Sequence, residues 1–307
     1  MSAGSISLRL YPHPELGATG IVDELQAQAA RAAAAGFDGI MTSEHHGGFA
    51  GYLPNPIQVA GWALEAMDSG TWAAPCPLLL PLRPTALVIE ELAWLAARFP
   101  DRVGLGVAAG SLVDDFTIMG LDKEDLTTRF AEALAVVADA LSGRDPGPLS
   151  GDVAVVRCAT HPVPVLTAAM SPAAARRAAG LGVGILIDSL SGPERAQDLI
   201  DTYRRAGGRA PAVVIRRVWI GEPPVDQVAR QVERYRTYAA ATAQAHWTDD
   251  QLITGSDAPA VADQLRTVIK ATGADACNLR VHAADIPAEA VRDQIDALAD
   301  VLALLRP

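Results

Sequence analysis

The alternation of eight short apolar runs with longer amphipathic stretches constrains the fold of this 307-residue chain more than any other feature. The runs are apolar on successive residues, as expected for parallel strands that are buried on both faces. They cover residues 6–11, 38–43, 72–80, 103–109, 164–169, 184–189, 212–220 and 277–283. Eight strands that alternate strictly with helices predict an α/β fold, a (β/α)8 TIM barrel that forms a single domain over residues 1–307.

Prolines and glycines indicate where the helices begin and end. Pro84 and Pro172 are expected in first helical turns, and Gly36 and Gly180 are expected as C-terminal caps of alanine-rich helices. Two connections are long, residues 110–162 and 221–255. The first is the better candidate for an active-site cover, because it begins directly at the carboxyl end of a strand.

Charge, cysteine content and hydropathy exclude several classes of protein. The net charge is −11, from 25 basic and 36 acidic residues in a mixed order, so the chain is not expected to bind nucleic acid. The three cysteines are far apart and lack a CxxC pair, which argues against a disulfide framework and a structural zinc site. Neither a secretory signal nor an apolar run of about 20 residues is present, so a cytoplasmic protein without a membrane segment is expected.

A polar cluster, Glu44-His45-His46, directly follows the second expected strand. Catalytic groups of (β/α)8 barrels lie at the carboxyl ends of the strands, so its position suggests function. A metal site is disfavoured, because neighbouring strand residues point to opposite faces and further ligands are not evident. Two interpretations remain: a polar strand end without chemistry, or an imidazole that acts as a general acid or base beside a carboxylate.

The residues around this cluster resemble the luciferase-like flavin-dependent monooxygenases. "EHH" is followed after eight residues by "NP", as in that family, and "LPLRPTALVIEELAWL", "DRVGLGVAAGSLVDDFTIMG" and "AAMSPAAARRAAGLGVG" are similar to further family segments in the same order. The C-terminal "TGSDAPAVADQLRTVIKATGADACNLRV" is also similar to the family. The family fold is a (β/α)8 barrel, which agrees with the prediction from the apolar runs.

The resemblance implies a catalytic role for His45, as a base or proton donor facing a flavin, and a less certain one for Glu44. His46 is assigned to the substrate pocket, with strand packing as the alternative. Glu-His-His favours FMN, whereas the deazaflavin-dependent members of the superfamily tend to have Asp-His. His45 is expected to point into a dry hollow of the size of the flavin ring.

The family often has a cis peptide beside the flavin ring at the end of the third strand. Proline lowers the cost of a cis bond from about 3 to under about 1 kcal/mol, so a cis bond is expected here, at Ala74–Pro75 as first choice and at Cys76–Pro77 as second choice. Two ordinary trans prolines are the alternative. The small residues Ala73, Ala74, Ala108 and Ala109 suit a flat ring close to the backbone.

Flavin phosphate binding departs from the family pattern. Luciferase-type members commonly place an arginine where this chain has Ala109. Arg129 matches another family arginine, and Ser171, with Ala169 and Met170 before it, begins a helix whose free amides attract anions. A plain helix cap is the alternative for Ser171.

Phe49, Tyr52 and Phe116 are expected to line the substrate pocket and to exclude water. No GxGxxG dinucleotide fingerprint follows an early strand, so a transient partner, a flavin reductase, is expected to supply reduced FMN. The predicted activity is oxygenation of a small organic substrate with O2 by a homodimer. A deazaflavin-dependent oxidoreductase and a non-catalytic flavin-binding relative are the alternatives.

Overall fold

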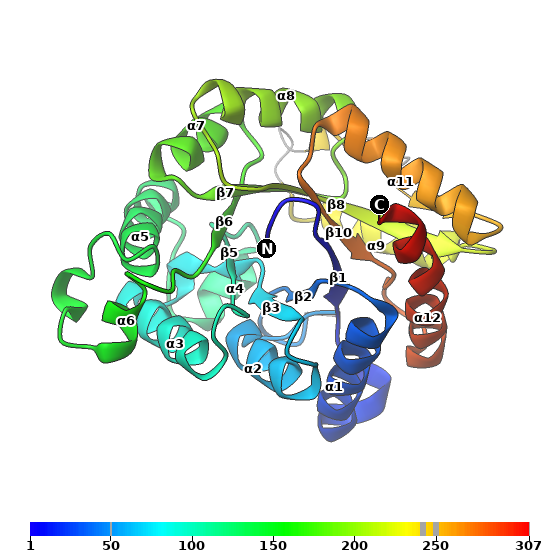
Figure 1. The fold of residues 1–307 in the computed structure, drawn as a ribbon, viewed down its shortest axis with the longest axis horizontal. Coiled ribbons are helices and arrows are strands. Elements are labelled where there is room, and N and C mark those ends of the chain that lie inside the picture. Colours follow the sequence, from blue (N-terminus) through cyan, green and yellow to red (C-terminus); the bar gives the residue numbers. More distant parts are fainter. Residues whose placement is uncertain (50, 240–243, 248–251, 307) are drawn as a thin grey trace.

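A ring of parallel strands surrounded by helices makes up the protein (Figure 1). The computed structural model describes residues 1–49, 51–239, 244–247 and 252–306. The strands are β1 (Ile6–Leu10), β2 (Gly39–Thr42), β3 (Trp72–Pro75), β4 (Leu78–Leu79), β5 (Leu105–Ala108), β6 (Val165–Ala168), β7 (Gly184–Ile187), β8 (Ala212–Ile220), β9 (Leu252–Gly255) and β10 (Ala276–Arg280). All eight predicted strands are present, and the predicted (β/α)8 barrel is confirmed.

The order of the strands closes the ring. Hydrogen-bonded neighbours follow the order β3-β2-β1-β10-β8-β7-β6-β5-β4. The two ends of this order meet, because β3 and β4 are the two halves of one predicted strand, residues 72–80. A parallel bridge between Ala73 and Val103 connects β3 to the chain just before β5. First and last strands pair as well, with Ser7 opposite Asn278.

Apolar stripes place the helices against the outside of the ring. The helices are α1 (Gly17–Ala35), α2 (Pro56–Ala66), α3 (Thr85–Arg98), α4 (Val113–Ile118), α5 (Leu126–Leu141), α6 (Val153–Arg157), α7 (Pro172–Leu181), α8 (Pro193–Arg205), α9 (Val225–Arg236), α11 (Ala258–Thr272) and α12 (Ala288–Leu305). Short 3-10 turns are η1 (Pro14–Leu16), η2 (Leu80–Leu82) and η3 (Gly147–Leu149). One large apolar core lies between the strands and the helices.

Two of the four predicted helix boundaries are confirmed. Gly36 ends α1 in the left-handed conformation, and Pro172 is the first residue of α7. Gly180 was wrongly predicted as a cap: α7 continues to Leu181, and Gly182, with φ 72°, is the capping residue. Pro84 precedes the first turn of α3 as its N-cap and does not lie within it.

The inside of the barrel holds a small apolar cluster and a buried arginine. Met41, Cys76 and Leu166 belong to this cluster. A Cβ atom at Gly106 would lie 2.0 Å from Cys76 Sγ, so only glycine fits where β5 passes that side chain. Arg9 is buried and donates hydrogen bonds to Asn278 Oδ1 at 2.8 Å and to the Cys76 carbonyl at 2.6 Å. Arg9 lies on β1, so it spans the seam where the first strand, β1, meets the last strand, β10, and also reaches the turn between β3 and β4.

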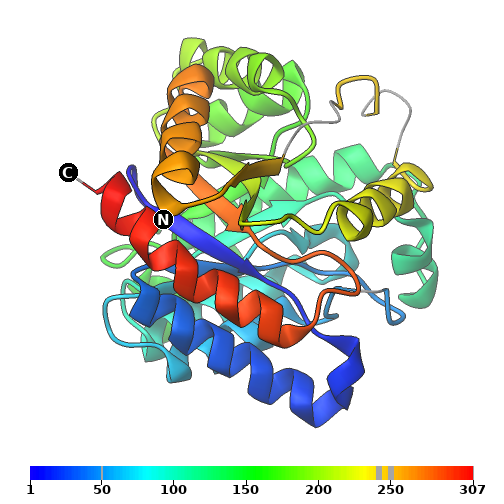
Figure 2. The same ribbon diagram turned by 90° about the vertical axis from the view of Figure 1, so that its right-hand side faces the viewer.

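The second long connection adds structure beyond the eight-unit barrel. β8 is nine residues long, and its last residues, 217–220, pair with β9. Helix α9 lies between these strands in the chain, at the barrel end toward which β1 runs, on the right in Figure 2. The sequence also predicts a helix over residues 226–244 in this connection; α9 covers its first half, and residues 240–243 lie outside the described residues.

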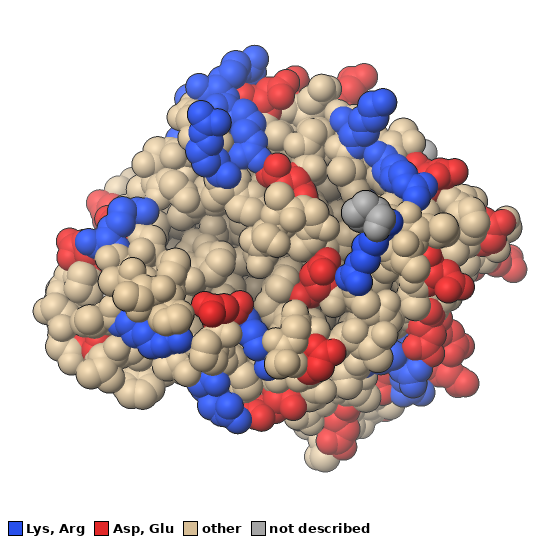
Figure 3. Space-filling model, viewed as in Figure 1, with Lys and Arg blue, Asp and Glu red and all other residues tan. Residues whose placement is uncertain are grey.

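Charged side chains are interspersed on the face shown in Figure 3, without a single basic or acidic field. Cys76, Cys158 and Cys277 are free thiols, and all three are buried. In the described part of the chain, no helix combines the length and the apolar character that crossing a membrane needs.

Candidate active site

The loop that follows β2 brings the predicted polar cluster to the carboxyl end of the barrel. A parallel bridge between Glu44 and Leu53 folds the loop back on itself, and the His45 amide donates to the Leu53 carbonyl. Asn55 ends the loop: its side chain accepts a hydrogen bond from the Gln58 amide at 3.1 Å and so caps α2. The position of the cluster at the functional end of the barrel is as the sequence predicts.

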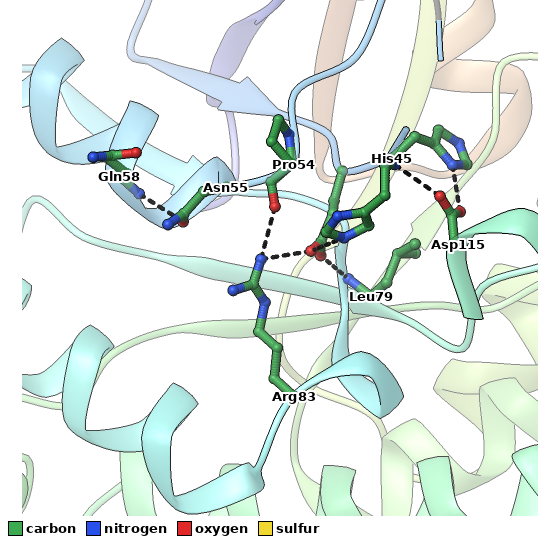
Figure 4. Close-up of polar contacts among 9 residues, drawn as sticks. His45, Pro54, Asn55, Gln58, Leu79, Arg83 and Asp115 are labelled. Atoms are coloured by element: carbon green, nitrogen blue, oxygen red, sulfur yellow. Dashed lines mark hydrogen bonds and ion pairs between the residues drawn. The ribbon is translucent and has the colours of Figure 1, made fainter. Parts of the chain in front are cut away.

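His45 contacts a carboxylate from a distant part of the chain. Its Nδ1 lies 2.7 Å from Asp115 Oδ2, and Asp115 Oδ1 accepts a hydrogen bond from the His46 amide at 2.8 Å (Figure 4). Asp115 lies in α4 and is fully buried, whereas 12% of the His45 side chain is exposed. A carboxylate at Nδ1 fixes the ring and favours the tautomer in which Nδ1 bears the proton.

Glu44 lies in a separate network of hydrogen bonds. Its buried carboxylate accepts from Arg83 Nη2 at 2.5 Å and from the Leu79 amide at 2.6 Å, and it lies 2.9 Å from His46 Nε2 (Figure 4). Arg83 also donates to the Pro54 carbonyl. Glu44 thus holds the loop onto η2 and contacts His46, not His45. A catalytic role for Glu44 stays a prediction.

Aromatic side chains surround the His45 ring. The ring centroids of Phe49 and Tyr52 lie 4.8 and 4.5 Å from that of His45, and Tyr238 follows at 6.1 Å. Two of the predicted pocket residues, Phe49 and Tyr52, therefore adjoin the predicted catalytic histidine. Phe116 does not adjoin His45 in this way: it belongs to a separate apolar cluster with Leu79 and Leu82.

The rings of Phe49, Tyr52 and Tyr238 form an aromatic layer around His45, and this layer adjoins a pair of buried arginines. Tyr52 Oη lies 2.8 Å from Tyr235 Oη, which accepts a hydrogen bond from Arg280 Nη2 at 2.6 Å. Burial raises the pKa of the Tyr235 phenol, but Arg280 and Arg217 beside it lower the pKa by more, so that the pKa lies below its usual value. Burial, and then Arg280, lower the pKa of Arg217 to about 10.

The residues predicted to bind the cofactor lie around neighbouring strand ends. Ala74 and Ala169 are fully buried and Pro75 is buried, while Ala108, Ala109 and Met170 are half-buried and Ser171 is exposed. Ser171 Oγ accepts from the Ala174 amide at 3.2 Å, so this residue is a helix cap. Arg129, on α5, donates to the carbonyls of Pro81 and Asp122, both at 3.3 Å.

The cis peptide lies two residues further along than the bond that the sequence favoured. Cys76–Pro77 is cis, so the preference for Ala74–Pro75 was wrong and the second candidate is correct. Pro77 stands between β3 and β4, and its carbonyl accepts a hydrogen bond from the Glu44 amide. The break in the predicted strand therefore faces the loop that bears the polar cluster.

The predicted hollow beside His45 is taken up by aromatic side chains. His45 is turned inward, but Phe49, Tyr52 and Tyr238 pack on it. A cavity of about 300 Å³ lies nearby, with Gly51 and His282 in its lining, and one of about 960 Å³ lies between α8 and α11; neither is lined by His45. Across the described residues, His, Cys, Asp and Glu form no group of three suited to a metal.

Sequence reasoning missed Asp115, Tyr235, Tyr238, Arg217 and Arg280. The arginines had a signal, because each interrupts an apolar run that was predicted as a strand. Tyr235 and Tyr238 come from the second long connection, which was ranked below the first as a cover. Both long connections therefore contribute side chains to the site around His45, since the first supplies Asp115.

Comparison with known proteins identifies one family over almost the whole chain. The family model described as luciferase-like monooxygenase matches residues 6–303. An uncharacterised protein of Mycobacterium tuberculosis is 33% identical over 108 residues, which cover 33% of this chain and 37% of that protein. The matched part thus spans little more than a third of the length of the curated relatives it resembles.

Solved structures with the same fold have little sequence identity to this chain. Monooxygenase RslO1 from Streptomyces bottropensis is 19% identical with a TM-score of 0.78, and the match covers 98% of this chain and 99% of that one. The oxygenating constituent of 3,6-diketocamphane monooxygenase from Pseudomonas putida, in complex with FMN, is 17% identical with a TM-score of 0.74 and 98% coverage of both chains. An F420-dependent secondary alcohol dehydrogenase is 18% identical, with a TM-score of 0.75 and complete coverage of both chains.

Proposed function

Because this chain belongs to the luciferase-like monooxygenase family, we propose that it uses reduced FMN and O2 to oxygenate a small organic substrate. The observation on which the proposal depends is the contact of 2.7 Å between His45 Nδ1 and Asp115 Oδ2 at the carboxyl end of the barrel. An oriented imidazole in a nearly closed aromatic layer is suited to proton transfer away from bulk water.

The residues present fit a flavin phosphate at one side of this barrel end. Helix α7 has ten residues, and its N-cap Ser171 and first turn are exposed, so the positive end of its dipole and the amide of residue 173 face solvent. Arg129 lies on the neighbouring α5. Among the described residues, its guanidinium donates to two carbonyls and lies 4.0 Å from the Asp122 carboxylate. We assign the phosphate to these two elements, and the edge of the ring system to Ala108, Ala109 and Ala169.

Bound reduced flavin supplies the electrons that activate O2. The side chains of this protein do the rest. Asp115 holds His45 through Nδ1, so Nε2 is the atom that takes up or releases a proton. Phe49 and Tyr52 exclude water from that atom, and entry of the ring system would require them to move apart. Glu44 positions the loop through Arg83 and the Leu79 amide.

Deazaflavin is the second candidate cofactor. An F420-dependent secondary alcohol dehydrogenase has the same fold as this chain, with a TM-score of 0.75, and this likeness supports deazaflavin as the alternative cofactor. Glu-His-His after β2 favours FMN. We further propose that a separate reductase supplies the reduced FMN, since the sequence lacks a dinucleotide fingerprint.

We also propose a cytoplasmic homodimer that pairs through α2 and α3. On α3, 44% of Leu87 and 54% of Trp94 are exposed, an apolar surface that a second copy could cover. Light scattering of wild type and Trp94→Lys tests this. A dimer that becomes a monomer on substitution is expected, and a wild-type monomer contradicts the pairing.

Stopped-flow mixing of the protein and reduced FMN with air tests the proposed activity. Flavin reoxidation slower than that of free FMN, through a species distinct from oxidised and reduced flavin, is expected. His45→Asn is expected to bind FMN normally but to change the decay of that species. Binding of deazaflavin without FMN would favour the second candidate, and reoxidation as fast as free FMN would make the protein a non-catalytic flavin-binding relative.

A further inference from the structure

Two arginines lie side by side inside the barrel. Arg217 of β8 and Arg280 of β10 are register partners in adjacent parallel strands, and only 3% and 4% of their surfaces are exposed. Val213 and Ile215 precede Arg217 on the inner face of β8, and alternate residues of a strand share a face. Both guanidinium groups therefore start from the inner wall, next to the aromatic layer around His45.

In the described part of the chain, no carboxylate neutralises this pair. Arg280 donates to Tyr235 Oη at 2.6 Å and to the His282 carbonyl at 3.2 Å, and its guanidinium lies 4.5 Å from the centre of the Tyr11 ring. Arg217 donates through Nη1 to Gln231 Oε1 at 2.9 Å. Within the described ranges, neither arginine forms an ion pair. Unpaired cations in a protein interior are costly, and like charges opposite one another add to that cost.

Arg217 also presents one complete unpaired edge. Its Nε and Nη2 are buried and have no hydrogen-bond partner among the described residues, while Nη1 is occupied by Gln231. Nε and Nη2 form the side of a guanidinium that binds a carboxylate through two parallel hydrogen bonds. The charge and the free donors thus point to the same ligand chemistry, a planar anion with two oxygens.

The surroundings of the pair limit what is attached to that anion. Tyr11 and Tyr52 meet edge to face with ring centroids 5.4 Å apart, and Tyr235 joins Tyr52 through their hydroxyls. The centroid of the Tyr52 ring also lies 4.5 Å from that of His45. An anion at Arg217 would therefore have an aromatic body beside tyrosine rings, in the direction of His45.

We propose that Arg217, supported by Arg280, binds the carboxylate of a small aryl carboxylic acid, which is the substrate that the enzyme oxygenates. The substrate assignment rests on the proposed oxygenase function, but the carboxylate site stands on the geometry of the two arginines. The carboxylate accepts hydrogen bonds from Arg217 Nε and Nη2 and neutralises the pair. Its aromatic ring replaces part of the tyrosine packing.

Binding of benzoate and benzamide to the flavin-free protein tests the proposal. Calorimetric titration is expected to show benzoate binding, with benzamide weaker by roughly ten-fold or more, because the amide lacks the charge. Arg217→Lys keeps a charge but loses the two-nitrogen edge, and it should weaken benzoate binding by a similar factor. Arg98→Met, at an exposed arginine on α3, is the matched control and should bind benzoate as wild type does.

Thermal unfolding provides an independent readout. Arg217→Met removes an unneutralised buried charge, so it should raise the Tm of the ligand-free protein and abolish the rise in Tm that benzoate produces. If Arg217→Met fails to fold, the benzoate and benzamide comparison and Arg217→Lys still decide the question.

Three binding results would overturn the proposal: equal affinity for benzoate and benzamide, no benzoate binding, or unaltered benzoate affinity in Arg217→Lys. A tyrosinate absorbance at neutral pH that Tyr235→Phe removes would also overturn it, because the ionised Tyr235 would then neutralise the arginines itself. A loss of FMN affinity in Arg217→Lys without a loss of riboflavin affinity would assign the pair to the cofactor phosphate instead. Failure of the oxygen reaction with benzoate binding intact would reject the oxygenase function and leave the carboxylate site.

Discussion

Asp115 bridges two consecutive residues of the β2 loop, because one carboxylate oxygen lies 2.7 Å from His45 Nδ1 and the other accepts the His46 amide at 2.8 Å. The same carboxylate therefore sets both the rotation of the imidazole and the backbone that bears it. Because Asp115 is fully buried, we expect it to orient His45 through these two contacts.

Asp115→Asn should lower the turnover number by about 100-fold or more while FMN binding stays within about two-fold, because an amide can present a donor to Nδ1 and select the wrong tautomer. Turnover and flavin affinity, measured separately, check this. Asp114→Asn alters the exposed neighbour and should leave both unchanged. Equal losses in the two variants would contradict an orienting role for Asp115.

Glu44→Gln should reduce the free energy of unfolding by about 3 kcal/mol, because it leaves Arg83 and His46 beside a neutral group in a buried site. Glu65→Gln breaks the ion pair with Arg98 on the surface and should cost under about 0.5 kcal/mol. Urea denaturation of both variants measures the difference. A cost for Glu44→Gln as small as that for Glu65→Gln would show that the Glu44 network contributes little.

Acidification should destabilise the protein through His282. Burial, and then His13, Arg280 and Arg217, hold the pKa of His282 well below its usual value, so the folded ring stays neutral while the unfolded ring gains a proton. The unfolded state then binds more protons, and the free energy of unfolding falls below about pH 6.5, by up to about 1.4 kcal/mol per pH unit for this group.

Urea denaturation at pH 7 and pH 5 measures this fall in wild type and in His282→Gln. The variant should lose less stability between the two values, although part of the slope remains because burial also lowers the pKa of His13. His161→Gln, at an exposed histidine, is the control. The same slope in His282→Gln and wild type would show that His282 is protonated in the folded protein.

Arg129→Met should weaken FMN binding by roughly 10- to 100-fold and leave riboflavin binding unchanged, because only FMN has the phosphate that the guanidinium would contact. Fluorescence titration with both flavins checks this. Arg144→Met removes another partly exposed arginine and should alter neither affinity. A parallel loss of riboflavin affinity would mean that Arg129 acts on the shape of the loop and not on the phosphate.

The strands could be predicted because parallel strands in a barrel are buried on both faces and so are apolar at successive residues. The pattern could not show that Pro77 interrupts the third strand, since β3 and β4 are apolar on either side of it. Nor could it choose between Gly180 and Gly182 as the end of α7, because both follow alanine-rich helical sequence and only the backbone at Gly182 turns left-handed.

The site was only partly predictable for a different reason. Glu44, His45 and His46 form a local motif, whereas the partner of His45 lies 70 positions away in sequence. Two carboxylates, Asp114 and Asp115, occur together there, and the rotation of α4 decides which is buried. The contact of Tyr52 with Tyr235 spans 183 positions, so it depends on how the second long connection packs across the barrel.

The seam between β1 and β10 has a consequence for how the protein matures. Arg9 spans it through Asn278, and Arg280 lies two residues beyond that contact on the last strand. Synthesis delivers β10 after the other strands, so Arg217 has no partner arginine beside it in a nascent chain until β10 has left the ribosome. Ligand binding should therefore appear abruptly along a series of C-terminal truncations.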